Sequence, residues 1–568
     1  MSLKNWNIPS ADIAAVQSLA DAMDLPHPIA QVLAARGFHT AEEIRGFLDP
    51  LLADFSDPFL LPDMGKAVAR IWKAIDAGET IAVFGDYDVD GVTSAALLIR
   101  MLDALGARVA GFIPDRLDEG YGLSPDAIQR CLLDQHPSLL VSVDCGTNSV
   151  ESVNHAQAQG VDVIVTDHHE PEERTAPAFA LINPKLGRGG ENLSGVGVAF
   201  KLSHALIKAG REQAKASAQR IDLRDYLDIA ALGTVADIVP LTGENRIIVR
   251  HGSERLGASR WVGMEALKEV AGISGEIDTY HLGFQLGPRI NAAGRIGEPM
   301  QALRLLTTND PLEARNIARL LDRNNLERRD IEARMADEAF AEIDAYFDPG
   351  RHFGLVVARE GWHPGVVGIV ASRVSRHYNR PAIIMGIEDD GSARGSCRSI
   401  DEFDLLEGLH TCEALLAKFG GHKMAAGLEV KPGRLDAFKE EFNAVAAAML
   451  EKKDLAPVQR IDAMVAAEDI DWTFYEKLKG LRPFGQDNPE PVWAMSGVQV
   501  QGAPRVVGQK HLKLAFAAGG HSFEAIAFNY PLASLPAGKM DVAFTLKENS
   551  WNGSTSLQLQ VQDIRTAK

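Results

Sequence analysis

Hydrophobic and polar positions along residues 64–166 predict four helix–strand pairs. Stretches with apolar residues at helical spacing each lead into a short, uninterrupted apolar run. The predicted pairs are helix 64–77 with strand 80–85, helix 92–105 with strand 108–113, helix 124–134 with strand 138–143, and helix 149–159 with strand 161–166. Strands that alternate with helices in this way form a mostly parallel sheet covered on both faces. The pattern therefore predicts an α/β fold.

The rest of the chain divides by the same pattern. Residues 310–347 form a long, charge-rich helical stretch, and strands at 353–358 and 381–385 indicate a second, smaller α/β lobe. From residue 455 onward, about five short segments alternate with period two between glycine turns, which is typical of an OB-like β-barrel. The expected domains are an N-terminal helical cap at 1–60, a catalytic domain at 61–309, a connecting helix at 310–347, a second lobe at 348–454 and the barrel at 455–568.

Composition narrows the class of protein. A length of 568 residues is too great for one core. The net charge of −19 argues against a surface that coats nucleic acid throughout, although it leaves room for a local basic groove. The four cysteines are widely spaced, so neither a disulfide framework nor a zinc site is expected. With no long apolar run, the sequence predicts a soluble, cytoplasmic protein with no membrane contact.

Acidic and histidine side chains follow the predicted strands at the points where they end. Asp86, Asp88 and Asp90 follow strand 80–85, Asp144 follows strand 138–143, and Asp167-His168-His169 follows strand 161–166. A further acid, Asp237, comes just after a helical pattern. Ligands of open α/β sheets bind at the carboxyl ends of the strands. Clustered carboxylates repel one another unless a cation lies between them, so this edge predicts a site for Mg²⁺ or Mn²⁺.

Each of these residues also has an ordinary structural interpretation. Asp144 could cap the next helix, His168 could be a buried core histidine, and Asp237 could close a turn before Pro240. The three acids at 86, 88 and 90 could form a solvated turn. Their joint placement at strand ends favours a two-metal site that hydrolyses a phosphodiester.

Five short motifs carry a family resemblance. They are DYDVDG at 86–91, SVDCG at 142–146, VTDHHE at 165–170, GTVADIVP at 233–240 and GGHKMAAG at 420–427. In this order and spacing, the motifs resemble those of the DHH phosphoesterase superfamily and its associated DHHA1 domain. Together with the C-terminal β-rich region, the chain is similar to the single-strand exonucleases of this superfamily. The resemblance implies removal of nucleotides from the 5′ end of single-stranded DNA with Mn²⁺ or Mg²⁺ as cofactor.

The resemblance also implies roles for the residues at the acidic edge. The implied metal ligands are Asp88, Asp90, Asp144, His168 and Asp237. His169 would act at the scissile phosphate as a charge stabiliser or proton donor, and Asp86 would be an outer ligand. One position departs from the wider superfamily, in which several members have a histidine ligand where Phe84 lies in this sequence. Because phenylalanine cannot bind a metal ion, the assignment of ligands to each ion stays open.

Basic and small residues elsewhere are candidates for binding the substrate. Arg116 lies in a predicted loop after strand 108–113, and the segment 287–295 is expected to be a small-residue loop that contacts phosphate. The segments 393–399 and 420–427 combine glycines with positive charge, which suits phosphate oxygens. The full set of candidates is Arg116, Arg289, Asn291, Ser396, Arg398, His422 and Lys423. Without the family, tight turns and surface ion pairs explain the same residues.

The expected partner is single-stranded DNA, with a helicase and a single-strand-binding protein as candidate protein partners. In the barrel, Arg505, Lys510, His511, Lys513 and Trp551 could provide charge and stacking for bases. Two other functions stay open from the sequence. One is a DHH phosphodiesterase of short oligoribonucleotides or cyclic dinucleotides, and the other is a replication scaffold without catalytic activity.

Overall fold

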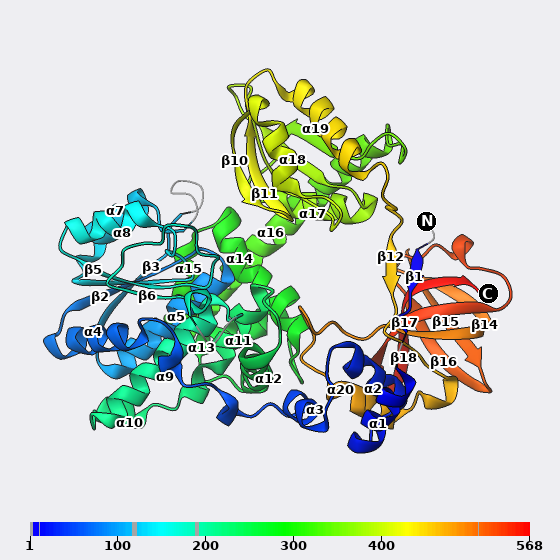
Figure 1. Cartoon of the computed structure of the whole chain (residues 1–568), viewed down its shortest axis with the longest axis horizontal. Coiled ribbons are helices and arrows are strands. Elements are labelled where there is room, and N and C mark those ends of the chain that lie inside the picture. Colours follow the sequence, from blue (N-terminus) through cyan, green and yellow to red (C-terminus); the bar gives the residue numbers. More distant parts are fainter. Residues whose placement is uncertain are drawn as a thin grey trace.

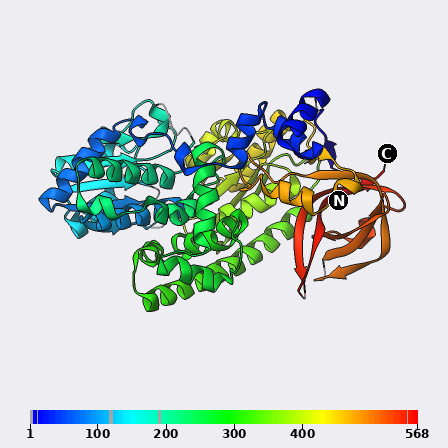
Figure 2. The same cartoon turned by 90° about the horizontal axis from the view of Figure 1, so that it is seen from below.

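The chain folds into three bodies (Figure 1). The computed structural model describes residues 4–10, 12–115, 122–187, 192–508, 510–551 and 553–567. The first α/β lobe lies at the left of Figure 1, the second lobe at the top, and the C-terminal β-barrel at the right. The turned view in Figure 2 shows the N-terminal helices, in blue, beside the barrel.

The first lobe is built on a parallel sheet of five strands in the order β3-β2-β4-β5-β6. The strands are β2 (Thr80–Gly85), β3 (Arg108–Phe112), β4 (Leu139–Val143), β5 (Asp162–Thr166) and β6 (Ala180–Ile182). Separate apolar cores cover the two faces of the sheet. Four of these strands follow the sequence prediction closely, whereas β6 is too short to give a clear apolar run.

Helices cover both faces of this sheet and extend beyond it. They are α4 (Met64–Ala77), α5 (Val89–Leu105), α7 (Pro125–Gln135), α8 (Val150–Ala158), α9 (Gly195–Glu212), α10 (Ala216–Arg220), α11 (Leu227–Ala236), α12 (Gly243–Leu256), α13 (Val262–Ala271), the π-helix η5 (His281–Leu286), α14 (Gly287–Ile296) and α15 (Pro299–Thr307). Helix α5 begins earlier than the pattern 92–105 predicts. Asp88 caps it, because the Oδ1 atom of Asp88 accepts the N–H of Gly91 at 3.0 Å.

A 34-residue helix, α16 (Pro311–Asp344), leads to the second lobe. That lobe has a mixed sheet in the order β10-β11-β9-β8-β7. Its elements are β7 (Leu355–Glu360), α17 (Val367–Tyr378), β8 (Ala382–Ile387), β9 (Ala393–Arg398), α18 (Leu405–Thr411), β10 (Leu416–His422), β11 (Ala425–Val430) and α19 (Leu435–Leu450). Helices α16 and α17 cover β7 and β8 with one apolar core, and α18 and α19 share a second core with the opposite face.

The C-terminal barrel is a closed ring of strands. It consists of β14 (Trp493–Val507), β15 (His511–Ala518), β16 (His521–Ala527), β18 (Ser554–Thr566) and β17 (Met540–Trp551), and the pairing of β14 with β17 closes it. The segment that leads into the barrel carries β12 (Val458–Arg460), β13 (Ala463–Met464) and α20 (Trp472–Lys479). Closure leaves no open sheet edge in the ring of these described strands.

The N-terminal segment belongs structurally to the barrel. Strand β1 (Asn5–Asn7) pairs with β12, and helices α1 (Ile13–Met23), α2 (His27–Ala35) and α3 (Ala41–Leu48) share one apolar core with the barrel strands. Arg246 of α12 fastens this body to the first lobe. Its buried guanidinium donates to the backbone carbonyls of Phe47 and Arg482, both at 2.7 Å, and lies over the Phe47 ring.

The structure confirms the predicted fold class and corrects one local prediction. The segment 287–295 is not a loop but most of α14, a helix that begins with proline at its second position. Proline is tolerated in the first turn of a helix, and the small residues let α14 pack closely, so the glycines and alanines indicate close approach rather than a turn. All four cysteines are buried and unpaired. Among the described residues, no helix is long and apolar enough to cross a membrane.

Candidate active site

The register of the parallel sheet brings three acids to one edge. Gly85 lies opposite Val143, and Val143 lies opposite Thr166. The next residue in each strand is therefore an aspartate: Asp86 after β2, Asp144 after β4 and Asp167 after β5. All three are at most 2% exposed. The structure thus gathers at the carboxyl edge the residues that the sequence places far apart.

Two helix N-termini meet this edge and fix a fourth acid. Asp90, in the first turn of α5, accepts the backbone N–H groups of Gly195 at 2.6 Å and Val196 at 2.8 Å, at the start of α9. Gly195 must be glycine, since a Cβ atom there would lie 2.5 Å from the Oδ1 atom of Asp144. The N-terminus of α9 therefore positions the Asp90 carboxylate while leaving space for Asp144 beside it.

His168 is the centre of the cluster. Its Nε2 atom lies 3.1 Å from Oδ1 of Asp144, 3.5 Å from Oδ2 of Asp237 and 3.9 Å from Oδ2 of Asp90. Asp237 reaches the cluster from the C-terminal end of α11. One imidazole nitrogen and three carboxylates from separate segments thus converge on one small space.

Several of these atoms have no hydrogen-bond partner although they are buried. Among the described residues, they include Oδ2 of Asp86, Oδ1 of Asp144, Oδ2 of Asp237 and Nε2 of His168. Leaving buried polar atoms unpaired is costly unless something else occupies the site. Two sets of possible ligand atoms lie within 4.8 Å of one another, Asp144 with His168 and His169, and Asp90 with His168 and Asp237. Oxygen-rich sets of this kind fit Mn²⁺ or Mg²⁺.

Burial and mutual repulsion shift the pKa values of the acids upward. Burial, reinforced by the charge of Asp88, raises the pKa of Asp86 to about 8 and that of Asp90 to about 7. Burial and Asp90 raise the pKa of Asp237 to about 9. Burial lowers the pKa of His168 to about 4, so its imidazole is neutral at neutral pH. A bound cation would displace protons from these carboxyl groups.

His169 has a different environment from its neighbour. Its Nδ1 atom lies 2.7 Å from Oδ1 of Asp167, a contact that outweighs the effect of burial and raises the pKa of His169. Asp167 in turn accepts the backbone N–H of Thr147 at 2.9 Å, and the Asn183 side chain donates to Thr147 and to the backbone carbonyl of His169. Asp167 and Asn183 therefore orient His169 at the edge of the cluster, and Asp167 favours the protonated form of its imidazole.

The positioning role of the residues behind His169 is not evident from the sequence pattern. Asp167 belongs to one of the motifs but is not predicted as the partner of His169, and neither Thr147 nor Asn183 is among the predicted site residues. The spacing of Asp167 and His169 could have indicated this contact, because the carboxylate of an acid two residues before a histidine can reach the Nδ1 atom of that histidine across a tight turn. Asn183 follows β6, which the apolar pattern does not reveal, so no signal points to it.

The second lobe carries an open, cationic face. Arg394, Ser396 and Arg398 alternate along β9 on the side away from the buried Ala393 and Cys397. Opposite them, β11 and β10 contribute Gly427 and Gly420, which would meet almost nothing if they carried a Cβ atom. Two adjoining hollows of ≈ 490 Å³ and ≈ 460 Å³ share this floor. We call this face the trough; its residues are Arg394, Ser396, Arg398, Lys418, Gly420, Gly427, Glu429 and His422.

One end of the trough has the features of an anion site. The Nη1 atom of Arg398 donates to Oγ of Ser396 at 2.8 Å. Gly368, in the first turn of α17, lies so close that a Cβ atom there would be 3.1 Å from that Oγ atom. Within the part of the chain that the structure describes, no side chain caps the N-terminus of α17. The positive end of its helix dipole therefore favours a negatively charged ligand. Ser396 and Arg398 thus lie together beside the start of α17, and their contact with a phosphate stays a prediction.

Helix α14 connects the acidic cluster with the trough. At one point it packs so tightly on the loop of Asp86–Asp90 that a Cβ atom on Gly294 would lie 2.9 Å from the backbone oxygen of Tyr87. The next residue, Arg295, donates to the carbonyl of Gly365 at 2.9 Å and lines the larger hollow of the trough. The two sites therefore lie on either side of one short helix.

The other predicted substrate-binding residues are placed less directly. Arg116 lies outside the described residues. Arg289 donates to the backbone carbonyl of Gln285 at 2.6 Å and to Asp322 of α16 at 2.9 Å, and Asn291 is half-buried on α14. His422 and Lys423 lie at the exposed turn between β10 and β11. Contact of these residues with substrate stays a prediction.

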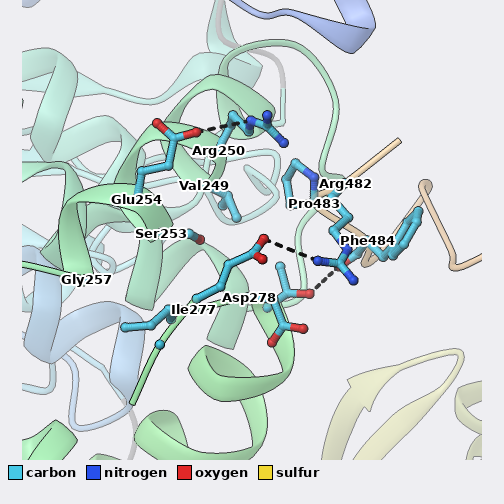
Figure 3. Close-up of a pocket in the computed structure, with 13 residues that line it drawn as sticks. Val249, Arg250, Ser253, Glu254, Gly257, Ile277, Asp278, Arg482, Pro483 and Phe484 are labelled. Atoms are coloured by element: carbon cyan, nitrogen blue, oxygen red, sulfur yellow. Dashed lines mark hydrogen bonds and ion pairs between the residues drawn. The ribbon is translucent and has the colours of Figure 1, made fainter. Parts of the chain in front are cut away.

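A further cavity of ≈ 360 Å³ lies away from the acidic cluster (Figure 3). Helix α12 forms one wall, and Arg482, Pro483 and Phe484 of the segment before the barrel form another. Ion pairs of Arg250 with Glu254 and of Arg482 with Glu276 border it. Since it holds none of the motif residues, it belongs to the junction between the bodies rather than to the active site.

Family models match the three bodies separately. The DHH family N-terminal domain matches residues 80–234, the DHHA1 domain matches residues 352–448, and the RecJ OB domain matches residues 461–563. The first match contains the acidic strand ends and the second contains the trough.

Curated relatives and solved structures match nearly the whole chain. The single-stranded-DNA-specific exonuclease RecJ of Bacillus subtilis is 37% identical over 577 residues, covering 100% of this chain and 71% of the relative. The enzyme of the same name from Escherichia coli is 35% identical over 565 residues, covering 95% and 96% of the two chains. The crystal structure of RecJ in complex with Mn²⁺ from Thermus thermophilus is 32% identical, has a TM-score of 0.85, and covers 99% of this chain and 80% of that one. A Mg²⁺ complex of the Thermus protein matches with a TM-score of 0.79. By sequence and by fold, the chain belongs to the RecJ family of single-stranded-DNA-specific exonucleases.

Proposed function

We propose that the chain removes nucleotides one at a time from the 5′ end of single-stranded DNA, with Mn²⁺ or Mg²⁺ as its cofactor, and serves DNA recombination and repair. The observation that carries this proposal is the convergence of Asp90, Asp144 and Asp237 on Nε2 of His168, with buried ligand atoms that lack partners. Membership of the family supports the substrate and the reaction.

The acidic edge would hold the cations. The proposed ligands are Asp88, Asp90, Asp144, His168 and Asp237, with Asp86 as an outer ligand that completes the first position where Phe84 cannot contribute. Phe84 is fully buried and stacks on Phe112 in the core, so it has a packing role. When bound, Mn²⁺ or Mg²⁺ supplies Lewis-acid chemistry, which activates water and neutralises charge at the phosphorus atom.

His169 is the proposed proton donor and charge stabiliser. Because Asp167 holds its Nδ1 atom and raises its pKa, the imidazolium form persists to higher pH than usual. A cationic ring at this place would stabilise the charge that develops on the phosphate and protonate the 3′ oxygen that leaves. The backbone N–H groups of Gly195 and Val196 keep Asp90 in place during this step.

The trough would hold the 5′ end of the strand. Ser396, Arg398 and the first turn of α17 would bind the terminal phosphate, and His422 and Lys423 would approach the next phosphate on the side of the acidic cluster. Arg116, Arg289 and Asn291 complete the predicted contacts in the first lobe. Holding the end at a fixed distance from the cations would explain why cleavage releases single nucleotides.

The C-terminal barrel would bind the strand before it enters the active site, as OB-like barrels bind single strands through charge and stacking. This function favours two protein partners. One is a helicase that opens a duplex, and the other is a single-strand-binding protein that covers the strand released by the helicase. A cytoplasmic location is likewise a prediction.

Digestion of an oligonucleotide labelled at either end tests the proposal. With Mn²⁺, the 5′ label should be released at once as a mononucleotide, while the 3′-labelled strand shortens stepwise and a duplex stays intact. Asp88→Ala should be inactive. Cleavage of only two- to five-residue oligomers, or no cleavage at all, would contradict the proposal.

A further inference from the structure

The trough extends beyond the place proposed for the 5′-terminal phosphate. Its face consists of three rows across β9, β11 and β10. The rows are Arg398 with Ala425 and His422, Ser396 with Gly427 and Gly420, and Arg394 with Glu429 and Lys418. In the proposed function, on which this inference rests, His422 lies toward the scissile phosphate. The row of Arg394 and Lys418 therefore lies on the far side of the terminal phosphate.

This outer row is open and positively charged. Arg394 is 63% exposed along its side chain and pairs with Glu429 at 3.0 Å. Lys418 lines the same hollow from β10, where it is exposed. Gly420 and Gly427 separate this row from Arg398, and neither position blocks the floor between them. A ligand at Ser396 can therefore extend toward Arg394 across a floor of glycines.

The spacing of the rows limits what the outer row can bind. Residues on one face of a strand are two positions apart, which is about 6.7 Å. Two further phosphate groups joined to a 5′-terminal phosphate extend over a comparable length. Arginine and lysine are suited to phosphate oxygens, arginine by paired hydrogen bonds and lysine as a compact charge.

We infer that the outer row of the trough, Arg394 and Lys418, binds the added phosphates of 5′-triphosphorylated single strands, so that such strands are substrates without prior trimming. Strands begun from a nucleoside triphosphate carry this end. In the first turnover, water attacks the phosphorus between the first and second nucleotides, and the bond from that phosphorus to the 3′ oxygen breaks. The first product is a nucleoside 5′-triphosphate with a 3′ hydroxyl, and the shortened strand carries a 5′ monophosphate.

The test compares synthetic oligodeoxynucleotides that differ only in a 5′ triphosphate or a 5′ monophosphate. With the wild-type protein and Mn²⁺, the triphosphorylated strand should be degraded with kcat/KM at least equal to that of the monophosphorylated strand. Anion-exchange chromatography should identify the first product as the nucleoside triphosphate. Release of pyrophosphate before any nucleotide, or resistance of the triphosphorylated end, would overturn the inference.

Variants test the assignment to the outer row. The double variant Arg394→Ala with Lys418→Ala should lower the ratio of kcat/KM for the triphosphate end to that for the monophosphate end by at least about tenfold, since one charge-assisted contact alone accounts for about that factor. Glu429→Gln should raise the ratio, because it removes a negative charge beside the added phosphates. Arg351→Ala, an exposed arginine that pairs with Asp348 outside the trough, is the matched control and should leave the ratio unchanged.

The outcomes separate this inference from the proposed function. If the wild type degrades the monophosphorylated strand and the double variant has an unchanged ratio, the outer row does not bind the added phosphates and the inference is wrong while the function stands. If the wild type degrades neither strand, the proposed function fails and the inference fails with it.

Discussion

The acidic edge of the first lobe and the trough of the second lobe are proposed to bind the same chemical group with opposite charges. At the edge, buried aspartates surround Nε2 of His168 and several ligand atoms lack partners among the described residues. In the trough, Arg394, Arg398 and Lys418 lie around an open floor that is formed by glycines. The edge can approach a phosphate only through cations, whereas the trough can bind one directly. Under the proposed function, the comparison separates two tasks: the edge carries out the chemistry and the trough recognises the 5′ end.

The largest expected effect follows from breaking the acidic edge. Asp144→Asn should lower kcat at least about a thousandfold, since it removes a ligand charge shared by the cluster. The exposed Asp134→Asn, on α7, is the matched control and should keep full activity. Circular dichroism would check that both variants fold. Near-normal turnover by Asp144→Asn would show that the edge does not hold the cations.

A smaller effect is expected from the residue behind His169. Asp167→Asn removes the charge that raises the pKa of His169, so the alkaline limb of the kcat–pH profile should move to lower pH. Turnover at neutral pH should fall by about 10- to 100-fold, as for other residues that orient a metal site. Measuring kcat across the neutral and alkaline range tests this. An unchanged profile would mean that His169 does not act as a charged group.

Substituting an arginine of the trough should affect recognition of the 5′ end rather than the hydrolysis of the phosphodiester. Arg398→Ala should lower the preference for a 5′-phosphorylated over a 5′-hydroxyl end by about tenfold. Competition between the two strands measures this ratio directly, with Arg351→Ala as the control. An equal loss on both ends would place Arg398 outside the end-binding site.

The smallest effect concerns stability. In the metal-free protein, burial raises the pKa values of Asp86, Asp90 and Asp237 from the usual 3.8 to about 8, 7 and 9. Between about pH 4 and 9 the folded state thus binds more protons than the unfolded state, so its stability should fall as pH rises through this window. In thermal unfolding, Tm should fall by several degrees as the pH rises. A loss of about 1 kcal/mol in the free energy of unfolding lowers Tm by ~2–4 °C in a domain of this size. Mn²⁺ should restore more stability at the alkaline end of the window than at the acidic end. The opposite trend would contradict the burial of these acids beside one another.

The sequence predicts the acidic edge well because local rules decide it. Each acid follows a short apolar run, and the carboxyl ends of parallel strands necessarily meet. Positive charge with glycine likewise indicates Ser396 and Arg398. These predictions need only the periodicity of strands and the chemistry of the side chains.

Other features depend on contacts between distant segments and cannot be predicted from local patterns. Gly195 and Val196 hold Asp90 from a helix more than a hundred positions away. The small residues of 287–295 suggest a loop, but tertiary packing against Tyr87 makes them a helix. Residues 1–60 show only short helical patterns, and their shared core with the barrel depends on the whole fold. Deleting residues 455–568 alone would therefore expose apolar faces of α1, α2 and α3, so point substitutions are the better test of the barrel.

Calorimetric titration of the metal-free protein with Mn²⁺, beside Asp144→Asn, tests the central claim most directly. Measured at neutral pH in two buffers of different ionisation enthalpy, the wild type should bind Mn²⁺ and release protons from the carboxyl groups of the acidic edge. Asp144→Asn should bind much more weakly. Equal binding by the two proteins, or binding by the wild type without proton release, would contradict the account of a cation site built from these buried acids.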